Sequence, residues 1–219
     1  MPFEGPLRDR LGPGDRLIET LGYRPGRGVR RLGLHLDRME RSADALGFAF
    51  DRSKAETALA RAATGESPLR LRLTLNADGA FETASSPFAP TPPDVVWRVA
   101  VAHTQLDSAD PLLAHKTTRR APYDAARAEF GVGIDEVILL NERDQVCEGT
   151  IANIFLDDGG GTLRTPGLEC GLLPGVRRAE MLAAGQAREA IVSIDDLRAA
   201  RALFVGNSLR GLIRAELTG

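Results

Sequence analysis

The order in which strand and helix patterns follow one another is the feature that most constrains the fold of this chain. Residues 16–23 and 28–34 are expected to form two strands around the turn RPGRG. Amphipathic helices are expected within 35–48 and 53–64. In 68–84, leucine first alternates with arginine or threonine and the chain then turns at NADG, which predicts a hairpin with one polar face.

The second half of the chain mixes strands and helices in a different order, without a clean repeat of strand, helix and parallel strand. The apolar run at 135–141 predicts a buried strand, and the polar stretch 103–111 is the best candidate for a linker. We therefore expect an α+β fold with mixed sheets. Its two lobes are a small N-terminal α/β lobe at 1–107 and a larger lobe at 108–219.

The composition is that of an ordinary globular protein, with 43% apolar residues, 26% charged residues and a net charge of −2. This balance points to neither nucleic acid nor an anionic membrane as a partner. No apolar stretch reaches the roughly 20 residues of a spanning helix, and the N-terminus lacks the apolar core of a signal peptide, so a cytoplasmic protein is expected. Cys147 and Cys170 do not have metal-ligand spacing, and no two histidines stand four residues apart, so no metal site is expected.

Lys116 stands out because the chain has 28 basic residues and only two of them, Lys54 and Lys116, are lysines. Lys54 lies in an amphipathic helix, where a solvated charge explains it. Lysine, unlike arginine, can lose its proton and become a nucleophilic amine. A partly desolvated Lys116 between the two lobes could form a Schiff base with an aldehyde cofactor, although a structural charge is the alternative.

Glu148 interrupts an apolar strand pair, where a carboxylate is costly unless it has a partner. It could face a protonated ring nitrogen of a cofactor, or it could be an ordinary strand-end residue in solvent. Thr150 and Asn153 follow it and add a hydroxyl and an amide that could orient a cofactor or brace the loop.

Three further places could bind an anion. Gly175 and Val176 open a helix, whose first backbone N–H groups and dipole attract negative charge. Asn207 and Ser208 form a polar turn after a strand, and Arg38 could grip a phosphate through two parallel hydrogen bonds. Each feature also has an ordinary structural explanation, but a reactive amine, a carboxylate and anion sites together suit pyridoxal phosphate.

Several motifs resemble those of a known family in order and spacing: GDRLIETL, HLDRM, HKTTRR, DEVILLNERDQVCEGTIANIF and TPGLECGLLPGVRR. They are similar to the class IV aminotransferases, the fold-type IV pyridoxal-phosphate enzymes, over roughly residues 14–210. The family includes branched-chain and D-amino-acid aminotransferases and 4-amino-4-deoxychorismate lyase. The resemblance implies a two-lobed α+β fold with the cofactor between the lobes, usually in a homodimer.

The resemblance also implies roles for individual residues. Lys116 would be the Schiff-base lysine and would carry the proton between substrate carbon and cofactor. Glu148 would hold the pyridine nitrogen protonated. The residues implied to bind the phosphate are Arg38, Val176, Arg177, Asn207 and Ser208.

The resemblance implies a transaminase that acts on a small amino acid and a 2-oxo acid. A 4-amino-4-deoxychorismate lyase that releases pyruvate is the alternative, and a cofactor-binding protein without turnover is a more distant one. The substrate half departs from the family pattern: Ile18 stands where an aromatic residue is usual, and Leu75 stands where some members have a carboxylate-binding arginine. Arg70 and Arg72 are nearby, and which of them faces the substrate depends on strand register.

Overall fold

The computed structural model describes residues 7–218, which divide into two compact units. The first unit contains the described residues up to Pro90 together with His115–Arg119, and the second contains Thr91–Ala114 and the described residues from Arg120 onward. The expected division was a single boundary after residue 107. The second unit instead begins at Thr91, and His115–Arg119 belong to the first unit. Strand pairing explains both differences.

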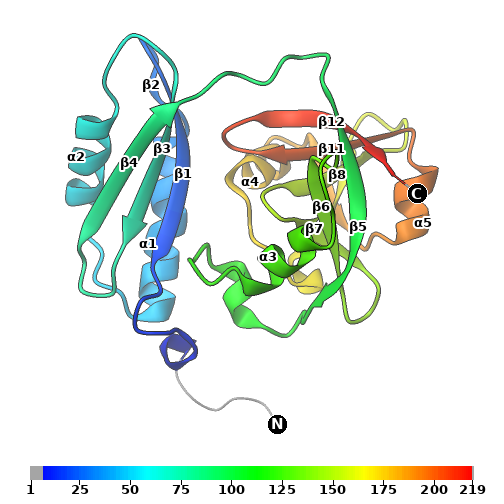
Figure 1. The fold of residues 1–219 in the computed structure, drawn as a ribbon, viewed down its shortest axis with the longest axis horizontal. Helices are drawn as coiled ribbons and strands as arrows, with labels where there is room; N and C mark the ends of the chain where they lie inside the picture. Colours follow the sequence, from blue (N-terminus) through cyan, green and yellow to red (C-terminus); the bar gives the residue numbers. More distant parts are fainter. Residues whose placement is uncertain (1–6, 219) are drawn as a thin grey trace. The chain divides into compact units, whose positions relative to one another are not determined.

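The first unit is an antiparallel sheet of four strands in the order β2-β1-β3-β4, with two helices against one face (Figure 1). Its elements are η1 (Leu7–Arg10), β1 (Leu17–Arg24), β2 (Gly28–Val29), α1 (Leu32–Leu46), α2 (Arg52–Ala62), β3 (Leu69–Leu75) and β4 (Phe81–Pro87). The strand expected at 28–34 is thus wrong beyond Val29. Gly28 and Arg31 both adopt positive φ, which turns the chain so that α1 begins at Leu32.

Alternation along β3 gives the sheet of the first unit two different faces. Leu71, Leu73 and Leu75 are fully buried on the face that the helices cover, whereas Arg70 and Arg72 are exposed on the other. We call this other face the polar face of the first unit. The apolar stripe expected on α1 is confirmed, since its four members are at most 2% exposed: Leu36, Met39, Ala43 and Leu46.

The second unit is built on a mixed sheet of eight strands in the order β10-β9-β8-β11-β12-β5-β6-β7. Edge strand β7 also contacts β8, so the sheet curls round on itself. Its strands are β5 (Val96–Leu106), β6 (Glu136–Asn141), β7 (Val146–Gly149), β8 (Asn153–Asp157), β9 (Leu163–Pro166), β10 (Ala187–Ala190), β11 (Ala202–Asn207) and β12 (Gly211–Leu217). Its helices are η2 (Pro111–Ala114), α3 (Ala121–Ala128), η3 (Leu168–Cys170), α4 (Val176–Ala183) and α5 (Ile194–Ala199).

Strand β6 confirms the buried strand expected at 135–141. Val137 and Leu139 pack into the same core cluster as Ala126 of α3. Ile138 and Leu140 pack into a second core cluster. Both faces of β6 are therefore covered by apolar side chains, which is why its sequence shows a continuous apolar run instead of an alternation.

Pairing of β5 with β6 explains why 103–111 is not simply a linker. Gln105 and Leu106 pair with Leu140 and Asn141, so the strand continues through half of that polar stretch. Conversely, Thr117 forms an isolated antiparallel bridge with Leu17 of β1, which places His115–Arg119 in the first unit.

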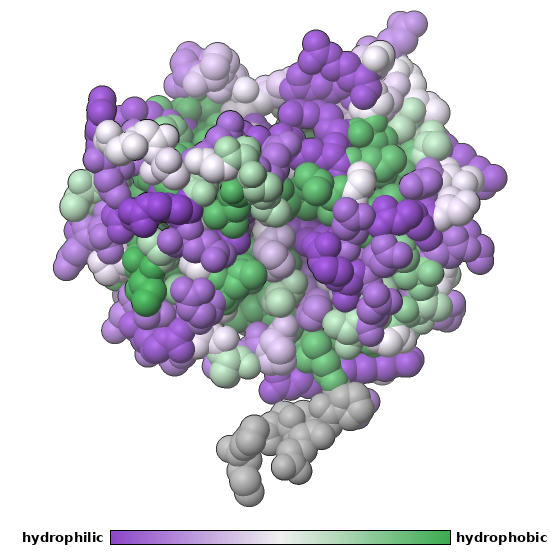
Figure 2. All heavy atoms as spheres, turned by 180° about the vertical axis from the view of Figure 1, so that it is seen from behind, coloured by the Kyte–Doolittle hydropathy of each residue, from purple (hydrophilic) through white to green (hydrophobic). Residues whose placement is uncertain are grey.

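Large apolar side chains are exposed at scattered positions of both units. Among the described residues they are Leu34, Val96, Val132, Ile151, Leu168 and Ile191. On the face seen in Figure 2, hydrophobic and hydrophilic residues are interspersed. Isolated apolar residues of this kind are usual on a protein surface. Within residues 7–218, no helix has the length and apolar character needed to cross a bilayer.

Candidate functional site

The segment that carries Lys116 is held in place by the first strand of the first unit. Leu17 and Thr117 form an antiparallel bridge, and the backbone N–H of Ile18 donates to the carbonyl oxygen of Lys116 at 2.8 Å. The bridge fixes the backbone of Lys116, and the lysine itself is half-buried.

Arg38 lies on the helix-covered side of the same sheet and is only 6% exposed. Its guanidinium donates to both carboxylate oxygens of Glu19, from Nε at 2.8 Å and from Nη2 at 2.6 Å. His35 Nδ1 lies 2.6 Å from Glu19 Oε2. Burial alone would raise the pKa of Glu19, but the positive charge of Arg38 and the contacts with His35 lower it to about 2. Arg38 is thus oriented by a buried ion pair and is not one of the surface arginines.

Glu148 is 4% exposed at the end of β7 in the second unit, so it is not a strand-end residue in solvent. Its Oε1 accepts hydrogen bonds from the hydroxyl of Tyr123 at 2.8 Å and from the backbone N–H of Leu173 at 3.0 Å. Asn153 Nδ2 lies 3.5 Å from Oε2. Burial and the neighbouring Glu148 raise the pKa of Tyr123, so its hydroxyl keeps its proton and donates it in this bond.

Thr150 follows Glu148 by two residues, and its hydroxyl donates to Glu136 Oε1 at 2.5 Å. The same carboxylate accepts the backbone N–H groups of Thr150 and Ile151, each at 3.0 Å. Arg120 Nη2 donates to the carbonyl oxygen of Thr150 at 2.7 Å. The structure therefore places Thr150 as a brace of the loop after β7, which was one of its two expected roles.

Val176, where the sequence predicted an anion site, is the first residue of α4. Its N-cap is Gly175, which provides no side-chain cap for the first backbone N–H groups. A Cβ added to Gly175 would lie 1.8 Å from Asn153 Oδ1, so only glycine fits beside this amide. The side chain of Arg177 forms an ion pair with Glu180, which leaves its backbone as the part that could bind an anion.

Asn207 organises the turn between β11 and β12. Its Oδ1 accepts the backbone N–H groups of Leu209 at 3.1 Å and Arg210 at 2.9 Å, and its Nδ2 donates to the carbonyl oxygen of Ile151 at 3.2 Å. Ser208 is 7% exposed in the same turn. The Asn207 turn is thereby tied to the loop that follows Glu148.

The expected site residues fall into two groups, one in each unit. In the first unit, Lys116 and Arg38 are both fixed by β1, through its consecutive residues Ile18 and Glu19. In the second unit, the loop at 149–153 connects the others through the contacts given above: Glu148, Thr150, Asn153, Asn207 and the start of α4.

The side chains of these networks that were missed in the sequence include Glu19, Tyr123 and Glu136. Two of them carried a usable signal, because Glu19 follows two apolar residues in β1 and Glu136 directly precedes the apolar run of β6. Tyr123 gave none, since a tyrosine in the first turn of an amphipathic helix is as often a packing residue.

A family model described as "Amino-transferase class IV" matches residues 16–217. Among solved structures, a protein from Mesorhizobium loti described as an amino-acid aminotransferase is 50% identical, with a TM-score of 0.91 over 93% of this chain and 100% of that one. The 4-amino-4-deoxychorismate lyase of Pseudomonas aeruginosa is 27% identical, with a TM-score of 0.78 over 93% of this chain and 83% of that one.

One curated relative is assigned as a branched-chain-amino-acid aminotransferase, from Thermotoga maritima. It is 33% identical over 105 residues, and this alignment covers 46% of the present chain and 38% of the relative.

Proposed function

Because the chain belongs to the class IV aminotransferase family, we propose that it is a pyridoxal-phosphate-dependent aminotransferase. It would move an amino group between a small amino acid and a 2-oxo acid. The likeness to the Mesorhizobium loti protein supports this reaction, since it extends over 93% of this chain at 50% identity. The family and the two-lobed α+β fold expected from the sequence are confirmed.

The observation that carries the cofactor proposal is the buried Glu148, whose Oε1 is held by Tyr123 and Leu173. These hydrogen bonds fix the orientation of the Glu148 carboxylate within the second unit. A carboxylate held in this way would pair with a protonated ring nitrogen of the cofactor, because an adjacent negative charge stabilises the protonated form. The donor set of the second unit therefore fits pyridoxal phosphate.

The phosphate would be bound at the uncapped N-terminus of α4, through the backbone N–H groups of Val176 and Arg177. Asn207 and Ser208 would complete this part, because their turn is tied to the same loop. Arg38 would add a guanidinium whose orientation Glu19 fixes. Thr150 and Asn153 would brace the loop that carries these groups.

When bound, pyridoxal phosphate supplies an aldehyde that joins amines and a ring that accepts electrons from the substrate. Lys116 Nζ would hold the cofactor covalently and then move the proton between the substrate carbon and the cofactor. Glu148 would keep the proton on the ring nitrogen, because an adjacent negative charge stabilises the protonated form. The protein would act in the cytoplasm, as a homodimer.

A second candidate is 4-amino-4-deoxychorismate lyase, which releases 4-aminobenzoate and pyruvate. The likeness to the Pseudomonas aeruginosa lyase favours it, at 27% identity over 93% of this chain. A cofactor-binding protein without turnover is less well supported, because both Lys116 and Glu148 are present. Assays with 4-amino-4-deoxychorismate and with an amino-acid panel plus 2-oxoglutarate or pyruvate separate the three.

Covalent labelling tests the lysine, with a control that the chain itself supplies. Borohydride reduction of the loaded protein should fix the cofactor mass to the peptide that contains Lys116. Lys54→Arg should keep this labelling, and Lys116→Arg should lose both labelling and turnover while the fold survives. Labelling at Lys54, or none on protein that holds the cofactor, contradicts the assignment.

Glu148→Gln tests the carboxylate, since it keeps the size of the side chain and removes its charge. We expect retained cofactor binding and a rate lowered roughly 10²-fold, if the charge contributes about 3 kcal/mol at 1.36 kcal/mol per tenfold. Arg38→Ala should weaken cofactor affinity first and spare turnover at saturating cofactor. If Glu148→Gln loses cofactor affinity and keeps its rate at saturation, the ring-nitrogen assignment is wrong.

A further inference from the structure

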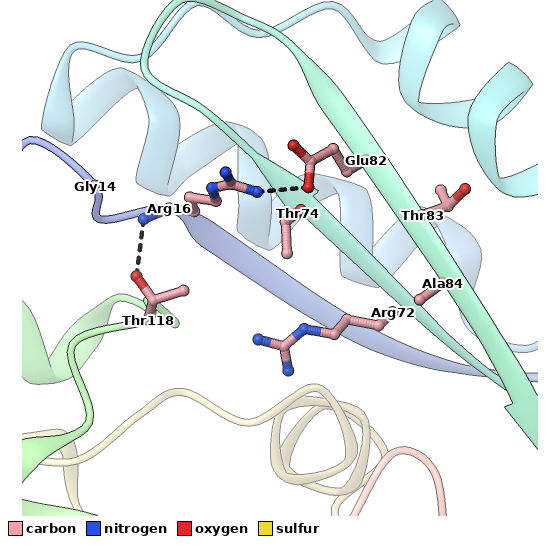
Figure 3. Close-up of a pocket in the computed structure, with 8 residues that line it drawn as sticks. All are labelled: Gly14, Arg16, Arg72, Thr74, Glu82, Thr83, Ala84 and Thr118. Atoms are coloured by element: carbon pink, nitrogen blue, oxygen red, sulfur yellow. Dashed lines mark hydrogen bonds and ion pairs between the residues drawn. The ribbon is translucent and has the colours of Figure 1, made fainter.

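The motif HKTTRR contributes residues to both units. In the first unit, Thr118 is anchored at the start of β1, because its Oγ1 accepts the backbone N–H of Arg16 at 3.0 Å (Figure 3). Arg120 instead belongs to the second unit, where it is the N-cap of α3. We infer that Arg120 and Tyr123 are positioning residues that keep Glu148 ionised beside the ring nitrogen of the cofactor. The inference rests on the proposed function.

Tyr123 provides Glu148 with a hydrogen-bond donor that carries no charge. Its hydroxyl donates to Glu148 Oε1 at 2.8 Å. A hydrogen bond to the ionised form of a carboxylate favours that form, so the proton shared with a ring nitrogen stays on the nitrogen. A cationic donor at this place would also favour the ionised form, but it would cancel the charge that holds the ring proton. The hydroxyl stabilises the negative charge without neutralising it.

The ring of Tyr123 is fixed by apolar side chains and by a cation. It packs against the core cluster that includes Leu139 and Cys147, the residue next to Glu148. Arg120 Cζ lies 5.0 Å from the centroid of the ring, within the range of a cation–π interaction. A tyrosine has only two side-chain torsions, so these contacts are sufficient to aim its hydroxyl at Glu148.

Arg120 connects Tyr123 to the loop that follows Glu148. Its Nη2 donates to the carbonyl oxygen of Thr150 at 2.7 Å. One guanidinium group thus contacts both the donor of Glu148 and the backbone two residues after Glu148. Its ion pair with Asp124, at 3.8 Å, involves a carboxylate that is 74% exposed, and such surface pairs contribute little. Lysine cannot replace this residue, because an ammonium group has no planar face to stack on the ring.

Nuclear magnetic resonance of protein loaded with pyridoxal phosphate that is isotopically labelled at its ring nitrogen shows where the proton lies, without requiring turnover. In the wild type we expect the signal of a protonated nitrogen. Tyr123→Phe removes only the hydroxyl and should move the signal toward that of an unprotonated nitrogen. It should also lower kcat about tenfold and change KM little, since a hydrogen bond to a charged group is lost. An unmoved signal overturns the inference.

Tyr23→Phe is the matched control, because Tyr23 is the other of the chain's two tyrosines. Its hydroxyl donates to the carbonyl oxygen of Gly65 at 3.3 Å, within the first unit. This variant loses the same chemical group and should keep both the wild-type signal and the wild-type kcat. A signal that moves equally in the two tyrosine variants would show that the contact with Glu148 is not the cause.

Arg120→Gln should move the signal in the same direction as Tyr123→Phe but less far, and Arg120→Lys should restore little of the change. Arg127→Gln is the control for lost stability. Arg127 lies in the last turn of the same helix, and its Nη2 donates to the carbonyl oxygen of Ile134 at 2.5 Å. Both glutamine variants lose an arginine contact with a backbone carbonyl, and only Arg120→Gln should move the signal. An equal movement in Arg127→Gln overturns the role of Arg120.

The stability of the cofactor-free protein separates this inference from the proposed function. Tyr123→Phe and Glu148→Gln, alone and combined, form a double-mutant cycle in urea denaturation. The double variant should lose less stability than the sum of the two single losses, because both substitutions affect the same hydrogen bond. Additive losses overturn the inference, even in a protein that transaminates. A protein that shows the coupling but takes no cofactor would disprove the proposed function and leave the contact between Tyr123 and Glu148 intact.

Discussion

Glu19 in the first unit and Glu136 in the second are both carboxylates on strands, 1% and 0% exposed. Glu19 is neutralised by a charge, because Arg38 binds both of its oxygens. Glu136 instead accepts hydrogen bonds from uncharged donors, namely backbone N–H groups and the hydroxyl of Thr150. The pKa values move in opposite directions: that of Glu19 falls to about 2, whereas burial raises that of Glu136.

The difference shows two ways in which a buried carboxylate can organise its surroundings. A charged partner stabilises the ionised form and gives a fixed orientation to one side chain, here that of Arg38. Uncharged donors stabilise the ionised form less completely, but one carboxylate can bind several of them at once. Glu136 in this way holds backbone N–H groups of the loop at 149–151. Substitutions at the two positions should therefore differ in size and in pH dependence.

Glu19→Gln should have the largest effect on stability, because it leaves Arg38 buried without its counter-charge. Breaking a buried pair in this way costs about 3–5 kcal/mol of the free energy of unfolding. Urea denaturation measures the change. The double variant Glu19→Gln with Arg38→Met should recover part of the loss, and a loss below about 1 kcal/mol in the single variant would show that the pair is not coupled.

Measuring the free energy of unfolding in acid should separate the two carboxylates, because their contributions change with pH in opposite directions. The pKa of Glu19 is lowered from 4.5 to about 2, so its stabilisation is present above pH 4.5 and is lost as the pH falls toward 2. It amounts to about 3 kcal/mol at 1.36 kcal/mol per pKa unit. The pKa of Glu136 is raised, so its cost grows as the pH rises above 4.5 and disappears on acidification.

Unfolding free energies measured between pH 6 and pH 2 therefore sharpen the comparison. Glu19→Gln should flatten the loss of stability in acid relative to the wild type, and Glu136→Gln should steepen it. The same direction of change in both variants would mean that the two carboxylates are stabilised in the same way.

Glu136→Gln should destabilise the protein by about 1–3 kcal/mol, which is the cost of leaving a buried donor without its acceptor. The amide has a single acceptor oxygen, and its NH₂ would face the N–H groups of Val137, Thr150 or Ile151. Amide hydrogen exchange at Thr150 and Ile151 should accelerate, as a local measure of the released loop. Unchanged exchange there would show that Glu136 does not hold the loop.

Thr150→Val should have the smallest effect, about 1 kcal/mol, because it removes one hydroxyl donor and keeps the backbone donors to Glu136. Thr150→Ser keeps the hydroxyl and serves as the control in the same denaturation experiment. A serine variant as unstable as the valine variant would show that methyl packing, and not the hydrogen bond, is what the threonine provides.

Much of the fold could be predicted because its patterns are local. The stripe on α1, the buried strand β6 and the leucine alternation of β3 all follow from side-chain periodicity. The unit boundary could not, because it depends on pairing between distant residues. β5 continues to Leu106 through its pairing with β6, and Thr117 joins β1 through a bridge to Leu17.

For the site, single residues could be singled out from the sequence, but their contacts could not. Glu148 was recognisable as a carboxylate in an apolar strand, and its burial bears this out. Its donor Tyr123 lies 25 residues earlier in the chain, and no local pattern connects the two.

The bridge between Leu17 and Thr117 has a consequence for how the protein is made. Strand β4 ends at Pro87, so the sheet of the first unit leaves the ribosome about 30 residues before Thr117 does. At about 5–20 residues per second, that sheet can pair and pack against its helices before the lysine is available. We expect Lys116 to dock last, by closure of a loop of about 100 residues, a slow and non-local step in folding. A newly synthesised first unit would then pass through a period in which its sheet is folded but Lys116, the lysine proposed to bind the cofactor, is not yet in place.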